Sequence, residues 1–179
     1  MEAFLEQYLL SEDGPGTVPF GGRDAELERL DHWLTDDQAA PRFLLAAPAG
    51  RGKSALLVQW MARLQMAGHV GKSEGSWRVV FFPISLRYST NLPRVFYEAL
   101  AARLNEAVDG DLKPPAEGAD PAAYYEDQCR RMLSIASGRN LSVLIIIDGI
   151  DEALGGALRR TGFRGGVAPN FAWWSPRAC

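Results

Sequence analysis

The sequence predicts an α/β fold in which helices are layered on a parallel sheet. Three apolar runs, at residues 42–47, 77–87 and 141–147, have the length and composition of strands. Stretches with apolar residues at the i, i+3, i+4 spacing of amphipathic helices alternate with these runs. Strands that alternate with helices imply parallel crossover connections, and therefore a layered α/β architecture rather than an all-β or all-α one.

The composition is that of a soluble globular protein with one domain. The chain has 179 residues, of which 47% are hydrophobic and 23% charged, close to the average for such proteins. The formal net charge of −3 gives no electrostatic reason to expect nucleic acid or an anionic membrane as the main partner. Cys129 and Cys179 have no metal-ligand spacing and form no disulfide framework, which favours a reducing compartment.

Neither a secretory leader nor a membrane span is predicted. The first ten residues, "MEAFLEQYLL", contain Glu2 and Glu6 and lack the basic start of a signal peptide. The longest apolar stretch, around 144–147, is far shorter than the roughly 20 residues that cross a bilayer. We therefore expect a cytoplasmic protein.

The first half of the chain is expected to contain three helices and one strand. A short helix is predicted at 2–10, and the turn-forming residues of "SEDGPGTVPFGG" predict a loop at 11–22. The run at 42–47, "RFLLAA", is typical of a buried parallel strand. Two amphipathic helices, at 23–34 and 54–68, flank it, and their expected apolar faces are Leu27, Leu30, Trp33 and Leu34, and Leu56, Leu57, Trp60, Met61 and Leu64.

The second half predicts a strand, two helices and a last strand. Pro83 lies inside "WRVVFFPISLR", so the strand is expected to end or bulge there. A helix is predicted at 90–108, capped by Thr90 or Asn91, with Pro93 in its first turn. After the loop "DGDLKPPAEGADP", another helix is predicted at 121–137, and the last strand at 141–147.

The octapeptide "APAGRGKS", residues 47–54, matches a relaxed form of the phosphate-binding P-loop, G-x-x-x-x-G-K-[ST]. Gly52, Lys53 and Ser54 occupy the last three positions, whereas Ala47 replaces the first glycine. A strand is predicted before this loop and a helix after it, as the mechanism requires. The predicted phosphate-binding residues are Ala47, Pro48, Ala49, Gly50, Arg51, Gly52, Lys53 and Ser54.

The residue types in this loop suit the chemistry of phosphate and Mg²⁺ binding. Backbone N–H groups from Gly50 to Ser54 can surround phosphate oxygens, and the helix that begins near Ser54 adds its positive end. Lys53 supplies a positive charge for the β- and γ-phosphates, and Ser54 supplies a hydroxyl for Mg²⁺. The octapeptide alone leaves open an ordinary turn with an exposed lysine.

A second stretch, "LIIIDGIDEA", supports the nucleotide interpretation. An apolar strand ends in Asp148, which suits a Walker B carboxylate that holds Mg²⁺. Asp151 and Glu152 follow in a short turn, where one of them can orient or deprotonate the attacking water. Because ligands of parallel sheets bind at the carboxyl ends of the strands, two such motifs at strand ends predict one shared site.

These motifs resemble the NACHT branch of the STAND NTPases, which are relatives of the AAA+ ATPases. The similarity extends over residues 15–153: Ile145 to Glu152 follow the last eight positions of the form hhhhDGhDE, and "PFGGRDAELERLDHWL" and "VVFFPISLRYSTNLPRVFYEALAARL" also resemble such proteins. The resemblance implies a P-loop NTPase three-layer sandwich with a parallel sheet, incomplete at the C-terminus. It also places the segment matching Phe20 to Arg23 beside the adenine, which assigns Gly22 and Arg23 to nucleotide binding.

The expected function is an ATP-binding and ATP-hydrolysing switch with ATP or ADP and Mg²⁺ as cofactors. The resemblance implies that ADP holds such a protein closed and that ATP opens it to self-associate and signal, and no N-K-x-D guanine signature favours GTP. One alternative is a truncated, non-enzymatic nucleotide-binding fragment with little turnover. Another is a DNA-loading AAA+ ATPase of replication-initiator type, which would need a basic surface that the net charge does not indicate.

Three segments are expected: an N-terminal helix and linker at 1–14, the NTPase core at 15–153, and an aberrant tail at 154–179. The tail contains no acidic residue and no lysine. Joining the third base of each codon to the first two of the next permits "PELRVVVSAR" near its end, which resembles the fourth strand and sensor-1 segment of the family. We hypothesise a disordered or frame-shifted tail. The strand that lies between the P-loop and Walker B strands in that family would then be missing, leaving both with unpaired edges.

Overall fold

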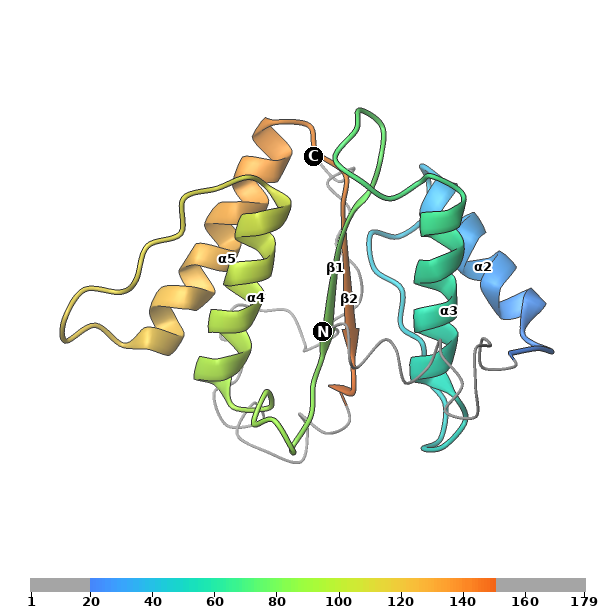
Figure 1. The fold of residues 1–179 in the computed structure, drawn as a ribbon, viewed down its shortest axis with the longest axis horizontal. Helices are drawn as coiled ribbons and strands as arrows, with labels where there is room; N and C mark the ends of the chain where they lie inside the picture. Colours follow the sequence, from blue (N-terminus) through green and yellow to red (C-terminus); the bar gives the residue numbers. More distant parts are fainter. Residues whose placement is uncertain (1–19, 151–179) are drawn as a thin grey trace, which may run out of the picture.

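The computed structural model describes residues 20–150, so the helix expected at 2–10 and the tail at 154–179 lie outside the described residues. Strands β1 (Arg78–Pro83) and β2 (Val143–Asp148) pair in parallel, from Arg78 opposite Val143 to Pro83 opposite Asp148. Helices α2 (Asp24–Thr35) and α3 (Lys53–Met66) lie on one face of this pair, and α4 (Pro93–Ala107) and α5 (Pro121–Gly138) lie on the other (Figure 1). The fold is therefore mixed α/β with a parallel sheet, as expected.

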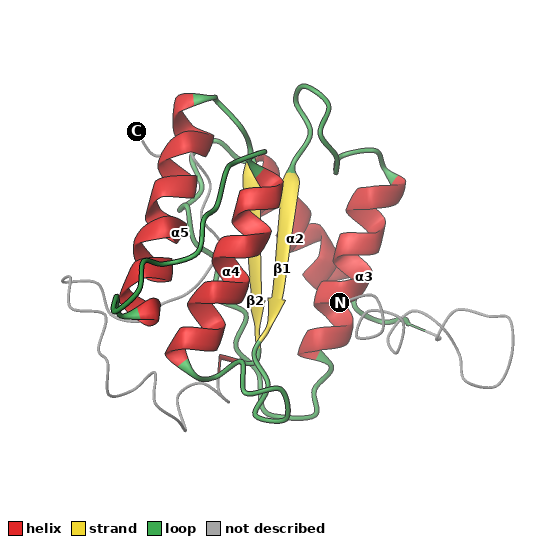
Figure 2. Cartoon of the chain, turned by 60° about the vertical axis from the view of Figure 1, so that its left-hand side comes forward, coloured by secondary structure: helices red, strands yellow, loops and turns green. Residues whose placement is uncertain are grey.

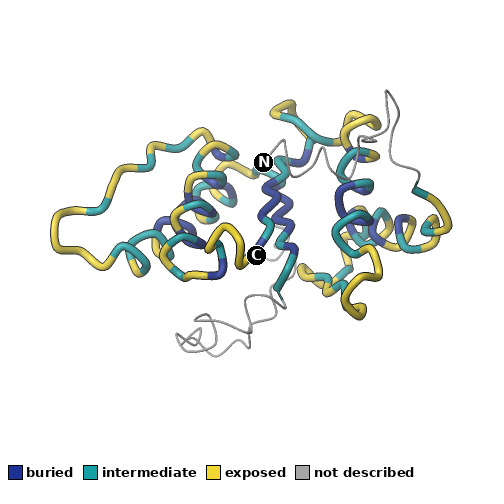
Figure 3. Tube along the Cα trace, turned by 60° about the horizontal axis from the view of Figure 1, so that its bottom comes forward, coloured by how far each residue is buried: buried dark blue, intermediate teal, exposed yellow. Residues whose placement is uncertain are grey.

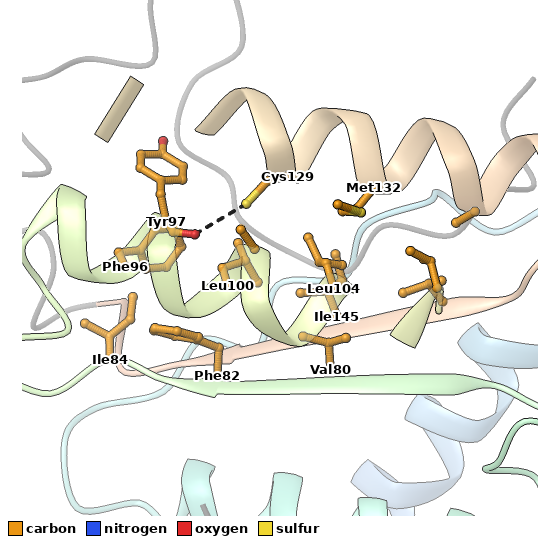
Figure 4. Packing of buried hydrophobic residues seen from close by; sticks show 14 residues of the cluster. Val80, Phe82, Ile84, Phe96, Tyr97, Leu100, Leu104, Cys129, Met132 and Ile145 are labelled. Carbon is orange, nitrogen blue, oxygen red and sulfur yellow. Dashed lines mark hydrogen bonds between the residues drawn. The ribbon is translucent and has the colours of Figure 1, made fainter. Parts of the chain in front are cut away.

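The two faces of the strands bury two separate apolar clusters, because successive side chains of a strand point to opposite faces. Val80, Phe82 and Ile145 pack with α4 and α5 around Phe96 and Leu104 (Figure 4). The intervening residues of both strands pack with α2 and α3, and they include Phe81, Leu144 and Ile146. Viewed toward the strand ends, both strands lie buried between the helix layers, whose outer sides are exposed (Figure 3).

The starts and ends of the helices follow the sequence signals in part. Gly68, with φ +71°, follows the end of α3 as expected. The predicted cap of α4 is wrong: the cap residue is Leu92, with no side-chain hydrogen bond. The Thr90 hydroxyl is instead used in the loop before α4, where it donates to the Pro83 and Ser85 carbonyls at 3.2 Å each. Local competition from the loop backbone thus outweighs helix capping.

The strand predicted at 42–47 is not present. This segment runs without ladder pairing between the sheet and α3 (Figure 1), and among residues 20–150 the sheet has only β1 and β2. Its side chains still alternate: Phe43 and Leu45 pack against the α2–α3 cluster, whereas Leu44 is 60% exposed. The segment therefore keeps the side-chain pattern of a half-buried strand but has no hydrogen-bonded neighbour, and the prediction of a buried strand was wrong.

No helix within residues 20–150 is both long enough and apolar enough to cross a lipid bilayer.

Candidate functional site

The loop that precedes α3 contains two glycines in left-handed backbone conformations. Gly50 and Gly52 adopt left-handed conformations, with φ +74° and +72°, which only glycine adopts at little cost. Gly52 is the N-cap of α3, and its carbonyl accepts a hydrogen bond from Leu56 N at 2.9 Å. A glycine cap brings no side-chain acceptor to the first N–H groups of the helix. This arrangement suits an anion held by backbone amides and the positive end of α3.

Lys53 folds back over this loop. Its Nζ donates to the Ala47 carbonyl at 2.9 Å and to the Pro48 carbonyl at 3.4 Å. The ammonium group therefore closes the loop from its last residues to its first. Both of these acceptors are neutral carbonyls, so an anionic phosphate oxygen would be a stronger partner for the same donor.

Arg23 connects the start of α2 to the loop. Its Nη2 donates to the Arg51 carbonyl at 3.0 Å, and its Nη1 pairs with Glu26 at 2.7 Å. The hydrogen bond from Arg23 is the main reason that the pKa of the Glu26 carboxyl is lowered. Gly22, the other residue assigned to the adenine, has φ +70° and directly precedes this contact. The structure thus brings the Arg23 side chain to the loop, and Gly22 is its neighbour in the sequence.

Asp148 lies at the carboxyl end of β2, at the same end of the fold as the start of α3 (Figures 1 and 2). It is only 8% exposed, and strand alternation places its side chain on the face of Leu144 and Ile146, which pack with α3. Its carbonyl accepts a hydrogen bond from Ile84 N at 2.8 Å. The loop and this carboxylate therefore share one end and one face of the fold.

The structure describes both expected metal ligands, Ser54 and Asp148, but not the expected catalytic residues. Asp151 and Glu152, the predicted catalytic carboxylates, lie outside the described residues. Within residues 20–150 no group of three or more His, Cys, Asp or Glu side chains could hold a metal ion unaided. Magnesium bound to a nucleotide needs less, because it keeps several waters and takes one or two protein oxygens plus phosphate oxygens. The half-buried Ser54 hydroxyl and the Asp148 carboxylate are ligands of the required type.

Sequence reasoning missed two features of this site. One is the contact of Arg23 with the loop backbone, for which no local signal exists. The other is Gly149, which has φ +78° and lies against the Ile84 carbonyl. An Asp-Gly pair after a strand is a turn signal that could have identified Gly149.

Comparison of the chain with protein-family models, with curated proteins and with solved structures gives no match. The functional argument therefore depends on the geometry and chemistry of the residues above.

Proposed function

We propose that this chain binds ATP with Mg²⁺ and hydrolyses the γ-phosphate, as the NTPase module of a switch of the STAND/NACHT type that its motifs resemble. One observation carries the proposal. A loop with two left-handed glycines and a lysine leads into α3 at the end and face of the sheet where Asp148 terminates β2. The loop alone or an aspartate at a strand end alone is a common structural feature, but the two together suit a nucleotide with its metal.

The loop and the start of α3 would hold the phosphates. Backbone N–H groups between Gly50 and Ser54 surround the β-phosphate, and the α3 dipole adds positive potential there. Lys53 exchanges its loop carbonyl acceptors, Ala47 O and Pro48 O, for phosphate oxygens. The exchange is favourable because hydrogen bonds to charged acceptors are roughly twice as strong as those to neutral ones.

Ser54 and Asp148 would hold the magnesium ion. When bound, the ion would supply positive charge that stabilises the phosphate oxygens during hydrolysis. The burial of Asp148 fixes its carboxylate at the end of β2. Asp151 and Glu152 follow three and four residues later, and we assign to them the orientation and deprotonation of the attacking water.

Gly22 and Arg23 would form the adenine side of the site. The left-handed Gly22 permits close approach of a planar base. The Arg23 side chain, which is 40% exposed, is held by the Arg51 carbonyl of the loop and by Glu26 of α2. We propose ATP or ADP as the ligand because the chain has no guanine-recognition signature.

A binding module without turnover is the second candidate, and the unpaired segment 42–47 favours it. In this structure the residues before the loop are not fixed in the sheet, and Ala47 to Gly50 are exposed. Phosphate binding needs only the loop, whereas hydrolysis needs the loop and the carboxylates in fixed alignment. A single-turnover assay separates the candidates: hydrolysis that Glu152→Gln abolishes supports the enzyme, and binding without hydrolysis supports the module.

The proposal is tested by substituting Lys53. Titration calorimetry with Mg·ATP should show a Kd raised by about 10- to 150-fold in Lys53→Ala, since a hydrogen bond to a charged group contributes roughly 1.5–3 kcal/mol. Lys113→Ala is the matched control, because this exposed lysine lies outside the loop and pairs with Asp111 at 3.4 Å. Equal Kd values for the two variants would contradict the proposed phosphate site.

A further inference from the structure

Gly149 is held against the backbone of the loop that follows β1. An ideal Cβ at this position would lie 2.4 Å from the Ile84 carbonyl oxygen and 3.4 Å from its carbonyl carbon. Other left-handed glycines of the described residues, such as Gly50, Gly52 and Gly118, have open space at the same point. At those three positions only the left-handed backbone favours glycine. At position 149 the contact with the Ile84 backbone also leaves no room for a side chain.

The contact lies at the last rung of the sheet. Ile84 donates its N–H to the Asp148 carbonyl at 2.8 Å, and its own carbonyl touches Gly149. Ile84, which follows the last residue of β1, thus contacts both Asp148 and Gly149. A side chain at position 149 would displace either the Ile84 backbone or the end of β2.

The size of this displacement decides its effect. Reaching ordinary contact at 3.4 Å from 2.4 Å requires a shift of about 1.0 Å, the difference between the two distances. Functional groups and metal ligands must be held within roughly 0.5 Å of their productive positions. The shift required by a single methyl group therefore exceeds what a metal-binding carboxylate at Asp148 tolerates.

We propose that Gly149 is a positioning residue for the metal ligand Asp148: its missing side chain lets β1 and β2 close at Ile84, and this closure sets the Asp148 carboxylate. The inference rests on the proposed function. It assigns the metal-dependent part of nucleotide affinity to the Ile84–Gly149 contact and the metal-independent part to Lys53 and its loop.

The test compares Gly149→Ala with Gly118→Ala in the full 179-residue chain. Both glycines have nearly the same φ, +78° and +80°, so both variants carry the same left-handed strain, but only Gly149→Ala adds the contact with Ile84. Affinity for ATP is measured by calorimetry with Mg²⁺ and with EDTA. We expect the factor by which Mg²⁺ raises the affinity for ATP to be at least about tenfold smaller in Gly149→Ala than in wild type. The affinity for ATP in the presence of EDTA should be unchanged, and Gly118→Ala should behave like wild type.

Two further measurements distinguish mispositioning of Asp148 from backbone strain and from loss of folding. Gly149→Asn relieves the left-handed strain, since asparagine tolerates that region, but keeps a Cβ, so it should lose the same metal-dependent gain as alanine. Amide hydrogen exchange of the nucleotide-free chain should be faster at Ile84 in both Gly149 variants and unchanged in Gly118→Ala. This readout is independent of any bound metal.

The outcomes separate the two proposals. A wild-type chain that does not bind ATP would overturn the proposed function and the metal role with it. Wild-type binding with an undiminished Mg²⁺ gain in Gly149→Ala would overturn the positioning role alone. Loss of cooperative unfolding in both Gly149 variants, or an equal loss of EDTA affinity, would show that Gly149 serves the whole fold and would also overturn it.

Discussion

The link between α2 and α3 can be tested through Trp60, which supports the helix that begins at the candidate loop. Trp60 has no exposed surface, and its Nε1 donates to the Asp31 carboxylate at 2.8 Å. The same carboxylate pairs with Arg63 at 2.9 Å. Trp60→Phe keeps an aromatic ring in the core but removes the donor. A hydrogen bond to a charged group contributes about 1.5–3 kcal/mol, and the smaller ring adds a packing loss.

A double-mutant cycle isolates the hydrogen bond from the packing loss. The free energy of unfolding is measured by urea titration with far-UV circular dichroism for wild type, Trp60→Phe, Asp31→Ala and the double variant. We expect a coupling energy of at least about 1.5 kcal/mol between the two positions, and a melting temperature about 3–6 °C lower for that amount of destabilisation. If Trp60→Phe is as costly without the Asp31 carboxylate as with it, the hydrogen bond does not hold the two helices together.

Two other predictions concern burial. Leu44→Ser should change the free energy of unfolding by less than about 0.5 kcal/mol because Leu44 is 60% exposed, whereas Leu57→Ala, at 3% exposure, should cost about 2–5 kcal/mol in the same urea titrations; a loss above about 2 kcal/mol for Leu44→Ser would indicate a buried strand at 42–47. Burial raises the pKa of the Cys129 thiol from 9.0 to about 12, so at pH 8 it holds about a thousandfold less reactive thiolate than an unperturbed thiol. Iodoacetamide followed by mass spectrometry should therefore modify Cys129 slowly in the folded chain and rapidly in urea, and equal rates would contradict this.

The elements with a strong local pattern were predictable from the sequence. All four described helices lie where hydrophobic periodicity predicted them, and both paired strands lie at predicted apolar runs. Strand β1 ends at Pro83, where an end or a bulge was expected. The segment 42–47 was not predictable in the same way, since a strand needs a hydrogen-bonded neighbour as well as an apolar sequence. The cap of α4 was also missed because Thr90 is satisfied within its own loop, which a linear pattern cannot reveal.

In the candidate site, too, local sequence signals were predictable and tertiary contacts were not. The loop conformation was predictable because Gly50 and Gly52 specify left-handed backbone locally, and the position of Asp148 followed from the end of an apolar strand. The bond from Arg23 to the Arg51 carbonyl joins residues 28 positions apart, so only the tertiary structure could show it. The need for glycine at position 149 likewise comes from Ile84, which lies far from it in the sequence.

The two halves of the candidate site are supported in different ways, and this difference bears on the proposed binding and hydrolysis of ATP. The Asp148 half is fixed by pairing of β2 with β1 and by the contact of Gly149 with Ile84. The loop half is held by α3, by Arg23 and by the bonds of Lys53 to its own loop, while the preceding segment has no partner in the described sheet. In the proposed site, a nucleotide would break the bonds of Lys53 to Ala47 and Pro48, and this would reduce its net binding free energy. Binding tolerates small misalignment between the halves, whereas in-line hydrolysis does not. Of the two proposed activities, we therefore expect phosphate binding to be the more robust and turnover to depend on how firmly residues 42–47 are held.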